Sequence, residues 1–240
     1  MLKMKTVKNK LSEIQALDNQ LEVGDGVFDR KGWLYVIVGP KGSGKSNLLS
    51  NLMQTSVKEQ GLQKRYDRIF FITPTRDAKL EDLISDCEDM GTYHDEFNDA
   101  VMEDIVDDIK AFKATWRKKR KPQMLVLMDD ILASLPSSRQ KKGPFVKFLF
   151  NHRHLSTDVI ILAQRYKDLP VSLRSQVDII STFGMHNTTE KKNFIEDFGV
   201  NEKIFHEVTG KPHNFLTVSM MRTGKPRLYD RYDEIVSDEE

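Results

Sequence analysis

Four residues with a fixed spacing, Gly39, Gly44, Lys45 and Ser46, follow an apolar run that begins at Trp33. They complete the pattern Gly-x-x-x-x-Gly-Lys-Ser/Thr, in which each residue type has a physical task. The glycines let backbone N–H groups close around phosphate oxygens, and the following helix points its positive end at the same anion. The lysine reaches the terminal phosphates and the serine hydroxyl suits Mg²⁺. The sequence thus predicts a nucleotide-phosphate site formed by Gly39, Pro40, Lys41, Gly42, Ser43, Gly44, Lys45, Ser46 and Asn47.

Two adjacent carboxylates, Asp129 and Asp130, follow a second apolar run at residues 124–128. Such a run predicts a strand buried on both faces, with the two acids at its C-terminal end. Beside a phosphate-binding loop this is the Walker B position, where Asp129 would hold Mg²⁺ through water and Asp130 would orient or deprotonate an attacking water. Alone the pattern is weak, because many strands end in acidic turns; the complete glycine-rich loop makes it strong.

Gln164 follows a third apolar run, residues 159–163. If this strand lies between the strand of the phosphate loop and the strand of the acids, the Gln164 amide is aimed at the γ-phosphate. The alternative is an ordinary polar residue at a strand end. The catalytic and Mg²⁺-binding residues predicted so far are Lys45, Asp130, Gln164, Ser46 and Asp129.

A parallel sheet would bring these strand ends to one edge. Apolar runs predict strands over residues 33–38, 67–73, 124–130, 158–164, 177–183 and 214–220. Apolar spacing of three to four residues predicts helices over residues 46–58, 78–88, 96–116, 144–152, 189–198 and 201–208. This alternation predicts an α/β fold with a doubly wound, mostly parallel sheet. The strand and helices between Lys45 and Asp129 further predict a P-loop NTPase of the additional-strand (RecA-like) division.

The length of 240 residues favours one α/β domain with short extensions. We expect an N-terminal extension with a basic arm and a short helix (1–30), a P-loop ATPase domain (31–230) and an acidic C-terminal tail (231–240). The single cysteine excludes an internal disulfide and fits a reducing compartment. No segment approaches the ~20 apolar residues of a membrane span, so we expect a soluble protein without a membrane partner.

The formal net charge is only +1, so nucleic-acid affinity would need a local basic patch. One basic run, residues 117–121, follows a predicted helix and is either a DNA-binding segment or a solvated helix end whose cations complement the helix dipole. The second follows the Walker B strand, where nucleotide state could move it. Its cations predict contacts with DNA phosphates, with a solvated loop as the alternative, and they are Arg139, Lys141 and Lys142.

Four segments together resemble the poxvirus-type genome-packaging ATPases of large DNA viruses and their virophage relatives, which belong to the FtsK–HerA superfamily. They are GPKGSGKS, MLVLMDD, NHRHLSTDVIILAQ and DLPVSLRSQVDIISTF. The resemblance covers about residues 30–230. The first segment is generic, whereas Arg-His-Leu-Ser before a strand that ends in Ala-Gln, followed by Leu-Pro and Arg, is much more specific. Asp130 departs from the superfamily's usual Glu, so it must approach the water more closely or accept a looser geometry.

The resemblance implies an ATP-driven motor that moves double-stranded viral DNA into a preformed capsid, as a homo-oligomeric ring of five or six subunits. It implies ATP and Mg²⁺ as cofactors and a capsid or portal-vertex protein as a partner. The implied location is the virus assembly site in the host cytoplasm, and association with the virion is the second implied location.

Other protein classes share parts of this pattern. A cellular or plasmid translocase or helicase of the same superfamily would use the same chemistry, although such proteins usually carry further domains. A nucleotide-switch binding module would hold the nucleotide without turnover. A nucleoside kinase would need acceptor-binding arginines and a lid that are not seen here, and a partitioning ATPase would have a second glycine where this chain has Ser43.

Arg153 stands where the resemblance places an arginine finger that enters the neighbouring subunit's site. A guanidinium is always charged and can bridge two γ-phosphate oxygens as negative charge develops there. The alternative is an arginine that pairs with a local carboxylate at a helix end. Arg174 and then Arg76 are the rival candidates for the finger.

Overall fold

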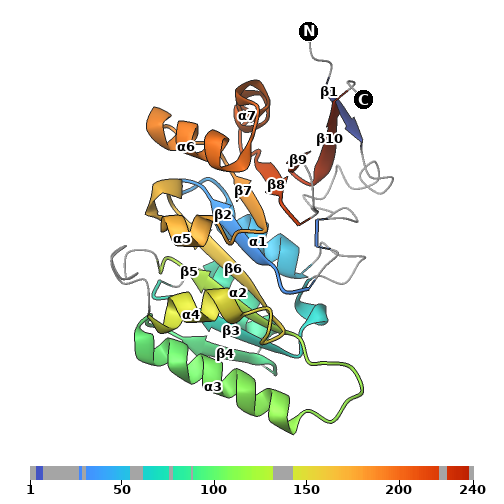
Figure 1. The fold of residues 1–240 in the computed structure, drawn as a ribbon, viewed down its shortest axis with the longest axis vertical. Coiled ribbons are helices and arrows are strands. Elements are labelled where there is room, and N and C mark those ends of the chain that lie inside the picture. The colour runs from blue at the N-terminus through green and yellow to red at the C-terminus, as the bar shows by residue number, and fades with distance from the viewer. Residues whose placement is uncertain are drawn as a thin grey trace.

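The computed structural model describes residues 4–7, 27–28, 31–54, 62–75, 78–87, 89–131, 143–221 and 226–237. Within these ranges ten strands form one sheet, in the order β1-β10-β9-β8-β7-β2-β6-β5-β3-β4 (Figure 1). The strands are β1 (Met4–Val7), β2 (Leu34–Val38), β3 (Arg68–Ile72), β4 (Gly91–His94), β5 (Met124–Asp129), β6 (Thr157–Ala163), β7 (Ile179–Thr182), β8 (Leu216–Ser219), β9 (Arg227–Asp230) and β10 (Asp233–Ser237).

The six strands from β7 to β4 pair in parallel, and β8, β9, β10 and β1 extend the sheet with antiparallel pairing. The parallel strands β2 and β6 are buried along their whole length, which explains the apolar residues 34–38 of β2 and 159–163 of β6. β6 lies between β2 and β5. The predicted α/β fold with a mostly parallel sheet, and the strand inserted between the loop strand and the acid strand, are confirmed.

Seven α-helices lie in the described ranges: α1 (Lys45–Gln54), α2 (Ala78–Asp86), α3 (Asp99–Thr115), α4 (Pro144–Asn151), α5 (Val171–Arg174), α6 (Thr188–Phe198) and α7 (Glu202–Thr209). Two 3₁₀ turns cover Leu62–Arg65 and Tyr166–Asp168. The side chain of Asn98 accepts a hydrogen bond from the Val101 N–H and so begins α3, while Pro144 occupies the first turn of α4. No helix in the described part of the chain is both long and apolar enough to span a bilayer.

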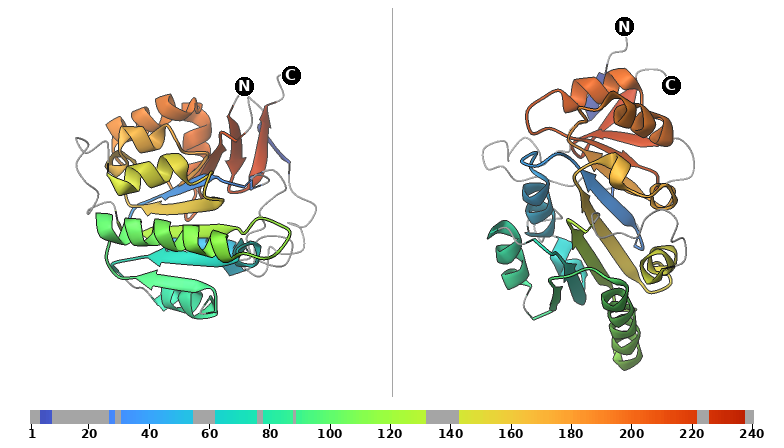
Figure 2. Two further views of the ribbon diagram at one scale, coloured as in Figure 1. Left: turned by 60° about the horizontal axis from the view of Figure 1, so that its bottom comes forward. Right: turned by 90° about the vertical axis from the view of Figure 1, so that its left-hand side faces the viewer.

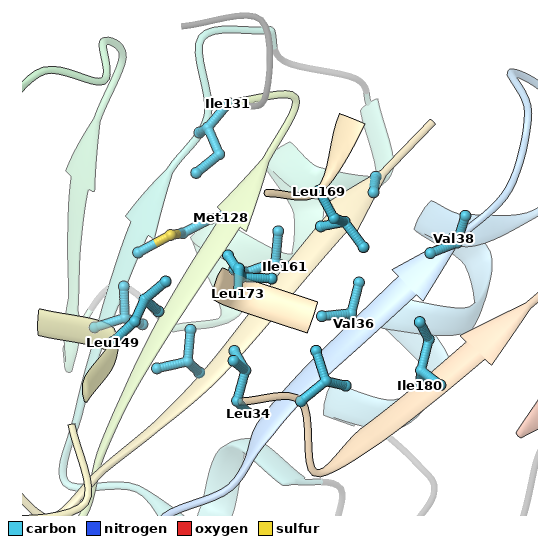
Figure 3. Packing of buried hydrophobic residues seen from close by; sticks show 14 of the residues in the cluster. Leu34, Val36, Val38, Met128, Ile131, Leu149, Ile161, Leu169, Leu173 and Ile180 are labelled. Carbon is cyan, nitrogen blue, oxygen red and sulfur yellow. The ribbon is translucent and has the colours of Figure 1, made fainter. Parts of the chain in front are cut away.

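Two hydrophobic layers sandwich the sheet. Along β2, Leu34, Val36 and Val38 belong to one layer, and Tyr35 and Ile37 belong to the other, because successive side chains of a strand point to opposite faces. The first layer is covered by α3 to α7 and the second by α1 and α2, as the right-hand view of Figure 2 shows. Figure 3 shows side chains of β2, β5, β6 and β7 packed against those of α4 and α5 in the first layer.

Four strands were not anticipated from the sequence. β4 is a short edge strand with no buried residue. Tyr229 lies in β9, and Tyr232 lies in the turn between β9 and β10. Residues 4–7, within the expected basic arm, pair with β10, so the ranges assigned to the extension and the acidic tail each contribute one strand. β1 depends on a pairing partner at the far end of the chain, which local composition does not reveal, whereas β9 and β10 pair with each other across a short turn. The predicted helix near residues 11–21 lies outside the described residues.

Candidate nucleotide-binding site

The glycine-rich loop joins the C-terminal end of β2 to α1, which begins at Lys45. The Gly39 N–H donates to the Ala163 carbonyl oxygen at 3.0 Å, which anchors the loop to the end of β6. A Cβ on Gly39 would lie 2.5 Å from Ser43 Oγ, and Gly44 has a φ of +109°. Gly44 therefore requires glycine because of its backbone angle, and a Cβ on Gly39 would also lie 3.1 Å from the Phe183 side chain.

Lys45 lies half-buried at the start of α1. Its Nζ donates to the carbonyl oxygens of Gly39 and, at 3.1 Å, of Pro40. Burial lowers the pKa of Lys45, while the carboxylates of Asp129 and Asp130 act in the opposite direction. The ammonium group is thus held beside the loop, on the same side as the two acids.

Asp130, Gln164 and Thr75 come together from the ends of three neighbouring strands, β5, β6 and β3. Gln164 Nε2 donates to Asp130 Oδ1 at 3.1 Å, and Thr75 Oγ1 donates to Asp130 Oδ2 at 3.3 Å. Asp130 has a φ of +55°, a left-handed conformation that Asp tolerates better than most side chains. Gln164 thus orients one oxygen of the Asp130 carboxylate, and Thr75 orients the other.

A pocket of about 740 Å³ opens between the loop and these strand ends. Its walls are formed by the start of α1, by both aspartates and by the residues that follow β3 and β6. The lining residues are Lys41, Gly42, Gly44, Lys45, Ser46, Asn47, Thr75, Asp129, Asp130, Leu162, Ala163 and Gln164. The predicted loop, acid pair and glutamine therefore share one cavity, whose volume suits a nucleotide.

The donor set of the pocket fits Mg²⁺ bound together with a phosphate. Ser46 and Asp129 offer a hydroxyl and a carboxylate oxygen, the ligand types that Mg²⁺ prefers. In the described ranges no group of three or more His, Cys, Asp or Glu side chains forms a separate metal cage. A Mg²⁺ ion here would therefore complete its octahedron with phosphate oxygens and water. The buried Ser43 hydroxyl, without a hydrogen-bond partner among the described residues, is a further donor available to a phosphate.

We expect Lys45→Ala to abolish nucleotide binding or turnover while the fold stays intact. Alanine suits the first turn of α1, but it removes the cation that reaches the terminal phosphates. Titration with a fluorescent ATP analogue and a phosphate-release assay measure both effects. Lys147→Ala, an exposed change on α4, is the control with the same loss of charge. Wild-type binding and turnover by Lys45→Ala would contradict the assignment.

Thr75 was missed by sequence reasoning. The signal was a polar residue just beyond a predicted strand, but only the pairing of β3 with β5 places it against Asp130. Its backbone is held in turn, because Thr73 Oγ1 donates to the Thr75 carbonyl oxygen at 2.7 Å. Thr75 is thus a positioning residue for the Asp130 carboxylate.

We expect Thr75→Val to lower ATP turnover about tenfold, equivalent to the loss of one hydrogen bond to a charged group. Nucleotide affinity should stay unchanged, because valine keeps the shape of the side chain. Steady-state kinetics separate the two effects as a fall in kcat at constant KM. Thr75→Ser, which keeps the hydroxyl, should recover most of the rate. Equal losses in the valine and serine variants would show that the hydroxyl is not responsible.

Arg153 lies at the opposite edge of the sheet, in the turn that precedes β6. Its Nε donates to the Gly32 carbonyl oxygen at 2.9 Å, and its guanidinium pairs with Asp178. β6 separates it from Gln164 by seven residues, which is roughly 23 Å of extended chain. Arg153 is therefore not part of its own subunit's nucleotide pocket. In this structure it pairs with a local carboxylate, that of Asp178, which is the alternative role to an arginine finger.

Arg174, the first rival, packs over the Tyr166 ring at 4.5 Å and donates to two carbonyl oxygens. Its side chain is 14% exposed, which favours a packing role. Arg76, the second rival, lies outside the described residues, as do the predicted DNA contacts Arg139, Lys141 and Lys142.

The fold is similar to those of several solved NTPases. The genome packaging NTPase B204 from Sulfolobus turreted icosahedral virus 2, in complex with AMP, is 19% identical with a TM-score of 0.58, and the match covers 82% of this chain and 96% of that one. The cytoplasmic domain of the Thermomonospora curvata type VII secretion ATPase EccC is 15% identical with a TM-score of 0.53, over 83% and 25% of the two chains. The pCW3 conjugation coupling protein TcpA is 12% identical with a TM-score of 0.53, over 85% and 61%.

No curated protein matches the chain. A family model, that of the Poxvirus A32 protein, matches residues 28–225. This range holds the glycine-rich loop, the acid pair and Gln164, and it confirms the resemblance drawn from the sequence. The chain belongs to the Poxvirus A32 protein family.

Proposed function

We propose that this protein is an ATPase that drives double-stranded viral DNA into a preformed capsid. The observation that carries the proposal is the pocket in which the glycine-rich loop meets Asp129, Asp130 and Gln164. Membership of the Poxvirus A32 protein family supports the viral setting. The fold shared with a viral genome packaging NTPase supports the motor role.

In this proposal the loop and Lys45 bind the phosphates, and Ser46 and Asp129 hold Mg²⁺. Bound Mg²⁺ supplies positive charge that offsets the negative charge of the β- and γ-phosphate oxygens. Asp130 takes a proton from a water whose oxygen forms a bond to the γ-phosphorus, while the bond from that phosphorus to the bridging oxygen breaks and ADP departs with the bond's electron pair. Gln164 and Thr75 keep the Asp130 carboxylate in place, and Gln164 also faces the γ-phosphate.

We further propose that hydrolysis takes place at subunit contacts in a ring of five or six copies. Arg153 supports this arrangement by its position, because it lies too far from its own pocket to act there and is exposed at the opposite edge of the sheet. To act as a finger it would exchange Asp178 for the γ-phosphate of a neighbouring subunit. ATP hydrolysis would then depend on the contact between subunits, as a motor whose subunits act in order requires.

The proposed partners are duplex DNA and a capsid or portal-vertex protein, and the proposed site of action is the virus assembly site in the host cytoplasm. A packaging motor must ignore DNA sequence, so contacts with phosphates are favoured over contacts with bases. The cations that follow β5 in the sequence, Arg139, Lys141 and Lys142, remain proposed DNA contacts.

DNA-stimulated ATP hydrolysis, combined with the mass of the oligomer with and without duplex DNA, tests the proposal. We expect a ring-sized mass and a turnover rate that rises when duplex DNA is added. Binding of ATP without hydrolysis in either condition would instead indicate a nucleotide switch. Hydrolysis that DNA does not change would remove the translocase role and leave an ATPase.

A further inference from the structure

A second pocket, of about 460 Å³, lies at the edge of the sheet opposite the nucleotide site. It is formed by the end of α3, by the segment that follows α3 and leads into β5, and by the turn before β6 (Figure 1). Six of its ten lining residues are lysine or arginine, and none of the ten is aspartate or glutamate. These six cations are Lys113, Lys118, Lys119, Arg120, Lys121 and Arg153.

The pocket has a fixed frame. Arg120 forms two hydrogen bonds with the Asp67 carboxylate, at 2.5 and 2.6 Å, and Trp116 Nε1 donates to the Arg120 carbonyl oxygen at 2.6 Å. The Asp67 side chain, 8% exposed, also accepts from the Gln123 N–H at 3.0 Å. Burial alone would raise the pKa of Asp67, but the hydrogen bonds from Arg120 and Gln123 outweigh it and hold this pKa below its ordinary value. The basic segment is therefore anchored and is more than a solvated helix end.

The charge of the pocket is only partly balanced. Arg120 pairs with Asp67, and Arg153 pairs with Asp178. The lysines make no ion pair with any carboxylate in the described part of the chain; Lys113 donates to the His154 carbonyl oxygen, and Lys118 lies 4.8 Å from the centre of the Trp116 ring. The lysines outnumber the nearby carboxylates, although Lys118 also interacts with Asp67, so an anion bound among them would offset their mutual repulsion.

We propose that this basic pocket binds the phosphate backbone of nucleic acid. Lysine ammonium groups act as point charges toward phosphate. Neither arginine is free to make planar, two-pronged contacts with bases, because Arg120 is held by Asp67 and Arg153 pairs with Asp178 or, in the proposed ring, with the neighbouring subunit's γ-phosphate. The pocket thus suits binding that is independent of sequence, with several phosphates in reach of exposed lysines. The proposal rests on the proposed translocase function and adds a DNA site at the far edge of the sheet.

The location gives this site a direct structural relation to the chemistry. β5 and β6 are neighbours, and each begins at the basic pocket and ends at the nucleotide pocket. β5 leads to Asp129 and Asp130, and β6 leads to Gln164. DNA and nucleotide would therefore contact opposite ends of the same two strands, which span about 20 Å.

The test is a triple variant, Lys118→Gln, Lys119→Gln and Lys121→Gln, which leaves Arg120, Trp116 and Arg153 intact. Binding of a fluorescent duplex of about 30 base pairs is measured from about 50 to about 300 mM salt, where each phosphate contact contributes about 0.9 to the slope of log K against log salt. We expect the triple variant to lower that slope by about 2 to 3 units. Its ATP turnover without DNA should stay unchanged.

The matched control neutralises three exposed lysines on α6, α7 and the following turn: Lys192→Gln, Lys203→Gln and Lys211→Gln. It changes the net charge equally, so wild-type DNA binding by this variant attributes the effect to the basic pocket. A wild-type slope in the pocket variant, or equal losses in both variants, would overturn the proposal while leaving the translocase function standing. A wild-type protein that binds no nucleic acid would remove both.

Two further measurements separate other ligands of the same pocket. If the pocket variant loses binding to vesicles containing anionic lipid but keeps its DNA affinity, the site serves a membrane surface and the proposal is wrong. If its DNA-free ATP turnover falls while its DNA binding stays unchanged, the lysines serve the contact between subunits and the proposal is again wrong. Equal unfolding temperatures for all variants verify that the fold is retained.

Discussion

Replacing Arg153 with alanine is expected to leave ATP binding unchanged and to lower ATP turnover of the assembled protein roughly 10³-fold, as for other arginine fingers. The guanidinium would offset negative charge on the γ-phosphate in the transition state of a neighbouring subunit, where alanine offers nothing. Phosphate release and binding of a fluorescent ATP analogue measure the two effects. Arg153→Lys should recover little, because an ammonium lacks the planar, two-pronged donor geometry.

A mixing experiment separates a finger that acts in trans from a purely structural arginine. Arg153→Ala subunits mixed with Asp130→Asn subunits should regain part of the activity, because an intact Asp130 then faces an intact Arg153 across some interfaces. Arg153 also contacts Gly32 and Asp178, so the unfolding temperature of each variant must be measured. A mixture that co-assembles and stays inactive would rule out the trans role and leave the Asp178 pair as the function of Arg153.

Replacing Asp130 with asparagine should preserve binding of ATP with Mg²⁺ and slow hydrolysis by at least ~100-fold, the lower range for loss of a general base. Asparagine is the appropriate substitution because it is nearly isosteric and tolerates the φ of +55° at this position. It also keeps an oxygen that can accept the hydrogen bond from Gln164. Single-turnover hydrolysis and equilibrium nucleotide binding provide the measurement.

Two companion variants at Asp130 make the result specific. Asp130→Glu keeps a carboxylate, so it should retain more activity than the asparagine variant. Asp130→Ala places a residue with no polar side chain at a positive φ. A fall in its turnover would therefore combine the effect of backbone strain with the loss of the catalytic carboxylate. Wild-type hydrolysis by Asp130→Asn would transfer the role of the base to another acid.

The sequence alone determined the features that depend on short stretches of chain. The glycine-rich loop is specified by local spacing, since the positive φ of Gly44 is a requirement of the loop itself. The buried parallel strands can be recognised in the sequence as apolar runs, because both of their faces are covered. The strand and helices that the sequence indicates between Lys45 and Asp129 were enough to predict the inserted strand.

Only the tertiary structure decided which distant side chains meet. Thr75 orients Asp130 because β3 pairs with β5, and Arg153 faces away from its own pocket because it precedes β6. The basic pocket exists because the turn before β6 folds against the end of α3. Strand β10 pairs with β1, more than 220 residues away in sequence. Such contacts come from hydrogen bonding and packing between remote segments, whose partners are set by the order of strands in the sheet and leave no local pattern in the sequence.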